Sequence, residues 1–201
     1  MNKLPEPLEN LVKHLSRLPG MGPKSSLRCA LAILKLPQSE AQSFGRTIYN
    51  LHDDLAICRR CGSLASQNPC PICADPSRSK DTLCLVSEWD SLLTLEEGGF
   101  YRGQYMLLGG LISPLDNMPP EALELELLRS RLREGEISEV VLALGATVEA
   151  DTTAQYIKDL ISREFAGVRV FRLAQGIPQG GEVKHMDRET LRQSLKYKQE
   201  L

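Results

Sequence analysis

The sequence predicts an α+β protein made of several modules: an N-terminal helix-hairpin-helix, a small four-cysteine zinc module, an α/β domain with a mainly parallel sheet, and a short C-terminal segment. Three observations predict this organisation. Two amphipathic patterns flank a Pro-Gly-x-Gly turn, two Cys-x2-Cys pairs follow, and continuous apolar strands then alternate with helical segments. The boundaries that we expect are 1–56, 57–78, 79–175 and 176–201.

The composition is typical of a folded chain whose charge is unevenly distributed. Hydrophobic residues make up 42% and charged residues 25% of the 201 positions, and the formal net charge is -2. No apolar run approaches the ~20 residues that cross a bilayer, and the N-terminus lacks the pattern of a signal peptide. We therefore expect no membrane partner and a cytoplasmic location.

Three amphipathic helices are predicted before the first cysteine pair. The first two carry apolar residues at i, i+3, i+4 and i+7, namely Leu8, Leu11, Val12 and Leu15, then Leu27, Ala30, Leu31 and Leu34. The third is expected from about Ser39 to Ala56. Its four inward-facing side chains are predicted to be Phe44, Ile48, Leu51 and Leu55.

The turn between the first two helices has the chemistry of a phosphate site. Gly20 and Gly22 permit a tight turn and a close approach, and Pro23 suits the first position of a helix. The free amide groups of such a helix start can hold a phosphate oxygen, and Lys24 follows at once. The motif predicts contact with the DNA backbone, independent of base sequence.

Residues 10–39 contain five cations and no acid, which is a basic region that the net charge conceals. The five are Lys13, Arg17, Lys24, Arg28 and Lys35. At 100° per residue, Lys24, Arg28 and Lys35 fall in one narrow sector of a helix beside the apolar stripe. The alternative interpretation is a plain turn with a solvated basic face.

Cys58, Cys61, Cys70 and Cys73 form two paired knuckles, and this is the most specific signal in the sequence. Four thiolates in a tetrahedral array suit a closed structural Zn²⁺ site. An iron–thiolate or iron–sulfur site and a redox pair are the alternatives. Arg59 and Arg60, inside the first knuckle, are expected to balance thiolate charge. The other two cysteines, Cys29 and Cys84, are expected in the core.

Four continuous apolar runs predict buried parallel strands. They are Leu83–Val86, Tyr105–Leu108, Val140–Leu144 and Val168–Phe171, and helices are expected around Glu121–Arg133 and Asp151–Phe165. Gly109 and Gly110 indicate a tight turn. The loop Leu111–Pro120 is long enough to suggest a partner contact, and a short strand and a helix are expected after Glu182.

Three acidic residues follow predicted strands, where ligands of open α/β sheets bind. They are Glu88, Glu149 and Asp151, and the last two are spaced i, i+2, which in extended backbone places both on one side. Such carboxylates can hold Mg²⁺. The competing interpretation, which we favour for Asp151, is that it caps the following helix.

Five motifs in order resemble the RecR family of recombination mediators over essentially the whole chain. They are LPGMGPKS at 18–25, the cysteines from Cys58 to Cys73, GGLISPLD at 109–116, TVE at 147–149 and GIPQGG at 176–181. The chain departs from the family pattern at Ala150, Asn117 and Pro119, where glycines are usual, and in the E-x-D of Glu149 and Asp151.

The resemblance implies a bacterial, nucleoid-associated protein in which the α/β part is a Toprim domain and the assembly is a ring-shaped homotetramer. It implies binding to single- and double-stranded DNA and cooperation with RecO and RecF in loading recombinase at gaps. Lys24 and Arg28 match family positions implicated in DNA contact, and Glu88, Glu149 and Asp151 match the Toprim acids.

Two further functions remain open at this point. A Mg²⁺-dependent nuclease of Toprim type would use the three acids, whereas the mediator is not an enzyme. A protein–protein adaptor with a merely solvated basic face is the third possibility.

Overall fold

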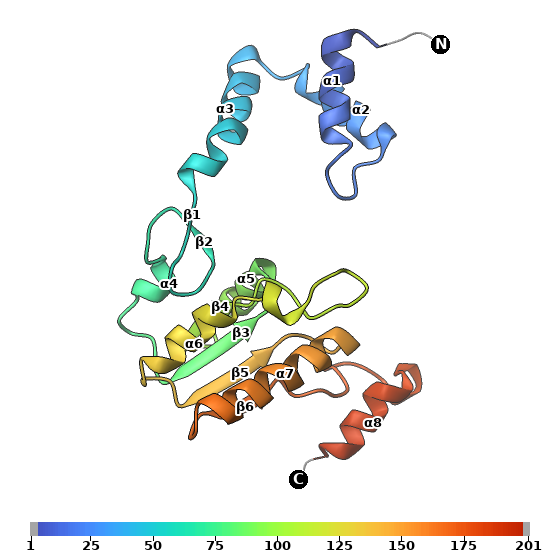
Figure 1. Ribbon diagram of the computed structural model, residues 1–201. Helices are drawn as coiled ribbons and strands as arrows, with labels where there is room; N and C mark the ends of the chain where they lie inside the picture. Colours follow the sequence, from blue (N-terminus) through green and yellow to red (C-terminus); the bar gives the residue numbers. More distant parts are fainter. Residues whose placement is uncertain (1–3, 199–201) are drawn as a thin grey trace. The chain divides into compact units, whose positions relative to one another are not determined.

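The computed structural model describes residues 4–198, and these divide into two compact units that meet in the chain between Asp54 and Leu55 (Figure 1). Each unit is described by itself. No helix in the described part of the chain is long and apolar enough to span a membrane.

The N-terminal unit contains three helices, α1 (Glu6–Leu15), α2 (Pro23–Ile33) and α3 (Gln38–Asp54). Helices α1 and α2 pack against each other. The predicted stripe of α1 is half-buried, and on α2 Ala30 and Ser26 are fully buried. The hydroxyl of Ser26 donates to the Gly22 carbonyl at 3.0 Å, so the start of α2 is tied to the turn. The two predicted helices and their connecting turn are confirmed.

Three predictions about burial in this unit are wrong. Leu31 and Leu34 of the stripe predicted for the second helix expose 43% and 66% of their surface, because α2 packs through Ser26 and Ala30 and ends before Leu34. None of the α3 residues is buried, and Phe44, Ile48 and Leu51 each expose about half of their surface or more. The helix is amphipathic as predicted, but nothing within the N-terminal unit covers its apolar face. Cys29 is exposed because α2 packs through Ser26 and Ala30 rather than through the cysteine.

The four-cysteine segment has little secondary structure of its own. Strands β1 (Ala56–Ile57) and β2 (Leu64–Ala65) pair antiparallel and carry the first knuckle between them, and α4 (Pro71–Ala74) begins at the second. The buried residues here are chiefly the cysteines themselves. Because this segment lacks an apolar core, we expect a bound metal to provide much of its stability.

The α/β part of the second unit is a four-stranded sheet in which every pairing is parallel, as predicted. The strand order is β4-β3-β5-β6. Its strands are β3 (Thr82–Val86), β4 (Gln104–Leu107), β5 (Glu139–Ala143) and β6 (Arg169–Arg172), and its helices are α5 (Trp89–Glu97), α6 (Leu125–Arg133) and α7 (Val148–Glu164), with a 3-10 turn η1 (Pro120–Ala122) before α6.

The sheet is buried on both faces because alternate strand residues serve two clusters. Leu83 and Leu85 of β3 pack with residues of α6 and α7, such as Leu128 and Ile157. On the opposite face Cys84 packs with Leu92 of α5, among others. Cys84 is therefore a core residue, as predicted, and burial raises its pKa to about 12.

The loop between β4 and α6 has a defined fold with its own backbone hydrogen bonds. Gly109 and Gly110 both have positive φ, and Ser113 and Met118 bridge each other through two backbone hydrogen bonds. Only Leu115, at the tip, is strongly exposed among the loop's large apolar side chains, with 90% of its surface open.

After β6 the chain forms a 3-10 turn, η2 (Val183–His185), and helix α8 (Arg188–Lys196). The predicted helix is present, but the short strand expected after Glu182 is not found in the described residues, because the chain turns there instead of extending. Ile177 donates its amide to the Ser194 hydroxyl at 3.0 Å, which folds the GIPQGG segment back onto α8.

Candidate metal centre and nucleic-acid interface

The four cysteines converge on one point. Their four sulfur atoms lie within 4.8 Å of one another, and the Sγ atoms of Cys61 and Cys70 are 3.6 Å apart. The Cys70 amide donates to the Cys58 sulfur at 3.4 Å, and the Cys73 amide donates to the Cys70 sulfur at 3.4 Å. Amides that point at sulfur stabilise thiolates, which are the forms that bind metal.

The hydrogen bonds and burial of the cluster favour a single thiolate when no cation is present. A hydrogen bond from the Cys73 side chain lowers the pKa of Cys61 to about 5. The same hydrogen bond, together with burial and neighbouring thiolate charge, raises the pKa of Cys73, and burial raises that of Cys70. Without a metal, the cluster stabilises one thiolate at the expense of the others. A divalent cation removes this conflict and releases protons as it binds.

The residues therefore fit a Zn²⁺ ion. Four soft thiolates with no open position are the donor set of a structural zinc site. Cys58, Cys61, Cys70 and Cys73 would hold the ion, and the ion would replace the missing apolar core of this segment.

The cation buried beside this centre is not one of the two arginines that the sequence suggested. Arg59 is exposed, and Arg60 turns its guanidinium to Glu134 at 3.0 Å. Instead Arg131 of α6, 2% exposed, donates to the Arg60 backbone carbonyl at 2.8 Å. Sequence reasoning missed it because Arg131 sits in a charged helical segment far along the chain from the knuckles.

The predicted phosphate-binding turn has the expected backbone. Gly20 has φ +74°, a conformation that favours glycine, and Gly22 occupies the N-cap of α2 with no side chain to cap the helix. Nothing lies within 4 Å of the Cβ position of either glycine. The space beside both glycines is therefore free, and no side chain caps the N-terminal amides of α2, which are groups that can bind a phosphate.

The predicted DNA-binding cations differ in how free they are. Arg17, Lys24, Arg28 and Lys35 are exposed, and none forms an ion pair within the described part of the chain. Lys13 forms an ion pair at 2.9 Å with Glu9, which lies just before the acid-free window of residues 10–39. Lys24 and Arg28 lie one turn apart on α2, but Lys35 lies beyond its end at Ile33, so the shared helical sector holds for the first two only.

The three acids of the α/β domain are not brought together as the sequence suggested. Helix α7 begins at Val148, so Glu149 and Asp151 lie in its first turn, where residues two apart point about 200° from each other. The prediction of one shared side is therefore wrong. Asp151 is not the N-cap either, because the Thr147 hydroxyl accepts from the Ala150 amide at 3.2 Å.

Glu88 and Asp151 have separate surroundings. Glu88 stands at the N-cap position of α5 without capping it, and the Asp151 carboxylate binds Arg172 at 2.7 Å. Within residues 4–198 the only group of His, Cys, Asp or Glu close enough to hold a metal is the cysteine cluster.

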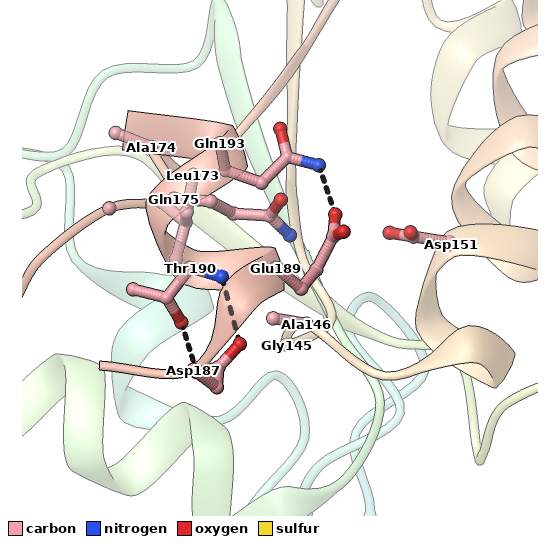
Figure 2. A pocket seen from close by; sticks show the side chains of 11 residues that line it. Gly145, Ala146, Asp151, Leu173, Ala174, Gln175, Asp187, Glu189, Thr190 and Gln193 are labelled. Atoms are coloured by element: carbon pink, nitrogen blue, oxygen red, sulfur yellow. Dashed lines mark hydrogen bonds between the residues drawn. The ribbon is translucent and has the colours of Figure 1, made fainter. Parts of the chain in front are cut away.

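Asp151 faces a pocket of about 470 Å³ at the ends of β5 and β6 (Figure 2). The opposite wall is α8, whose Asp187 and Glu189 also line the pocket. Asp187 caps α8 by accepting from the Thr190 amide at 2.9 Å, and Glu189 is bound by Arg192 and Gln193. Every carboxylate of the pocket is thus engaged within the chain, and neither Glu88 nor Glu149 lines it.

Comparison with known proteins covers all three regions. Residues 8–51 match the family described as RecR, helix-hairpin-helix, residues 55–75 match the RecR zinc finger domain of the four-cysteine type, and residues 81–174 match the Toprim domain. The recombination protein RecR of Nitratidesulfovibrio vulgaris (strain Miyazaki F) is 62% identical, and that of Maridesulfovibrio salexigens 53%, each over the full length of both chains. RecR of Alcanivorax borkumensis is 41% identical over 94% of each. With these matches, and with a zinc-type cysteine cluster that follows the helical hairpin and precedes the parallel sheet in the sequence, the chain belongs to the RecR family of recombination proteins.

Proposed function

We propose that this protein is a non-catalytic DNA-binding mediator of recombinational repair, which helps to load recombinase onto single-stranded DNA at gaps. The observation that carries the proposal is the open amide end of α2, with Lys24 and Arg28 exposed beside it. Backbone amides and unpaired cations on one helix start match the chemistry of a phosphate and carry no means of reading bases.

The DNA-contact residues are proposed to be Gly20, Gly22, Lys24 and Arg28, with Arg17, Lys35 and Lys13 at the periphery. Lys13 has the weakest case because DNA has to compete with Glu9 for it. The N-terminal unit has two more Lys and Arg than Asp and Glu, whereas the second unit has four fewer. Electrostatic attraction to DNA is therefore expected to act through the N-terminal unit.

The alternative of a Mg²⁺-dependent nuclease has weaker support. A Toprim-type site needs several carboxylates free to share one ion. Here Asp151 is paired with Arg172, and Glu149 points away from it on α7. The Toprim fold is proposed to serve as a scaffold. The four functional modules of the chain are proposed to be residues 1–56, 57–78, 79–175 and 176–201.

We further infer that the protein works as a homo-oligomer, a ring tetramer, and acts with RecO and RecF in the bacterial cytoplasm at the nucleoid. Two surfaces of the chain support an assembly. The apolar face of α3 is uncovered, and Leu195 on α8 exposes 71% of its surface. Leu115, at the tip of its folded loop, is a candidate contact for a partner protein.

The test follows the fluorescence anisotropy of a labelled duplex with a single-stranded overhang over time, with Mg²⁺ present, at two salt concentrations. The wild type is compared with Lys24→Glu/Arg28→Glu. Lys158→Glu/Arg163→Glu is the matched control, because it makes the same charge change on exposed residues of α7.

We expect anisotropy to rise, to remain high and to fall with salt. The α2 double variant should bind weakly, with a salt slope about one to two units shallower, and the α7 variant should bind almost as well as the wild type. A signal that decays as the DNA shortens would indicate a nuclease. Equal loss in both double variants would show that only net charge matters.

A further inference from the structure

Arg131 is a buried cation with an unusual set of partners. One guanidinium nitrogen donates to the backbone carbonyl of Arg60, between the two ligands of the first knuckle, at 2.8 Å. Another donates to the side-chain oxygen of Gln104 on β4, which is itself buried. The side chain thus joins α6, the sheet edge and the Cys58–Cys61 turn.

The negative charge available to Arg131 within the chain is incomplete. Its nearest carboxylate is that of Glu134, at 3.9 Å, and Glu134 lies closer to Arg60, at 3.0 Å. The Nε of Arg131 is buried and finds no hydrogen-bond partner in the described residues. A buried guanidinium with so little compensation is costly unless another anion is near.

The zinc centre presents the complementary problem. Four thiolates exceed the charge of one Zn²⁺ by two units, and three of the four cysteines are buried. Backbone amides offset part of this excess at Cys58 and Cys70. A cation buried next to the knuckle can offset more of it, and can do so without entering the coordination sphere.

We propose that Arg131 is a positioning residue of the zinc centre. It holds the Arg60 carbonyl, which fixes the turn that presents Cys58 and Cys61, and it supplies positive charge to the tetrathiolate site. Arg60 itself cannot take this second role, because its guanidinium is turned to Glu134 and its side chain is partly exposed. The proposal concerns how strongly the metal is retained and does not depend on the DNA-binding function.

The test measures the zinc dissociation constant of the full chain by competition with a chelator of known affinity. Arg131→Gln removes the charge but keeps a hydrogen-bond donor. Arg131→Lys keeps the charge. Leu128→Ala, fully buried on the same helix, controls for lost stability, and Arg133→Gln, exposed two residues away, controls for lost charge. The visible spectrum of the Co²⁺-substituted protein reports the geometry of the thiolate shell in each variant.

Arg131→Gln is expected to weaken zinc binding by about 10- to 100-fold and to alter the Co²⁺ spectrum. Arg131→Lys should bind zinc more tightly than Arg131→Gln, and both controls should keep the wild-type constant. The proposal is overturned if Arg131→Gln retains zinc as the wild type does, if the lysine variant gives no recovery, or if Leu128→Ala loses zinc equally.

Discussion

At the scale of single residues, two features organise the metal centre: the four cysteine sulfurs converge on one point, and the buried guanidinium of Arg131 holds the Arg60 carbonyl beside them. The four cysteines could be predicted because a thiolate in a paired knuckle has few other uses. Asp151 was misassigned because the helix begins three residues earlier than expected, and that shift gives the cap to Thr147. Arg131 could not be found from the sequence, since its partner, the Arg60 carbonyl, is a backbone atom distant in the chain.

Thr153 is a second residue whose role only the structure reveals. It is fully buried on α7, where its hydroxyl accepts from the Ile112 amide at 2.8 Å and donates to the Glu149 carbonyl at 2.7 Å. We predict that Thr153→Val lowers the free energy of unfolding by about 1–3 kcal/mol, because the isosteric change leaves the Ile112 amide without its partner. Urea denaturation of the zinc-loaded protein measures this.

Thr153→Ser is the matched variant, because it keeps the hydroxyl and removes only a methyl group. It should lose clearly less stability than the valine variant. If the two variants unfold at the same urea concentration, the hydroxyl does not anchor the loop that begins at Leu111.

At the scale of elements, hydrophobic period predicted which segments are helices and strands but not what each packs against. The four parallel strands were found because their apolar runs are continuous, as sheets buried on both faces require. The zinc segment could not be placed from sequence. In the structure it closes one edge of the sheet, because the Leu107 amide of β4 donates to the Cys61 carbonyl at 2.8 Å.

Removal of zinc is therefore predicted to loosen that edge selectively. Two adjacent amides provide the comparison: Leu107 bonds to Cys61, whereas Leu108 bonds to Val86 of β3 at 2.9 Å. After chelation, hydrogen exchange measured by NMR should accelerate by at least about tenfold at Leu107 and much less at Leu108, since local opening exposes only the bonds that it breaks. Equal acceleration at both amides would mean that the whole sheet depends on the metal.

At the scale of the whole molecule, the two units differ in how well their buried residues could be predicted from the sequence. The second unit buries its apolar strands within the same chain, so its core residues could be predicted from the apolar pattern. The N-terminal unit does not, because α3 exposes the apolar face that its period predicts. The prediction that the apolar side chains of α3 face inward failed for a physical reason. An amphipathic pattern indicates that one face of a helix is to be covered, but it does not indicate whether the same chain or another chain covers it.

The last prediction concerns what covers that face. Phe44, Ile48 and Leu51 lie within about 60° of one another on the helix, and each is 48–58% exposed. Monomeric proteins rarely leave such a stripe open, and the proposed homo-oligomer provides a partner of matching chemistry. Ile48→Glu should therefore shift the mass measured by light scattering after gel filtration towards the monomer, because assembly would bury an unpaired charge.

Gln42→Glu is the control, because it introduces the same charge on the other side of the helix, about 160° from Phe44, and should leave the mass unchanged. DNA binding by the two variants separates two sources of affinity. If Ile48→Glu gives monomers whose hairpin still binds DNA, but with a shallower salt dependence, then each chain contributes phosphate contacts and the oligomer multiplies them. If Ile48→Glu leaves the mass unchanged, the α3 face is not a subunit contact, and any assembly has to use another surface such as α8.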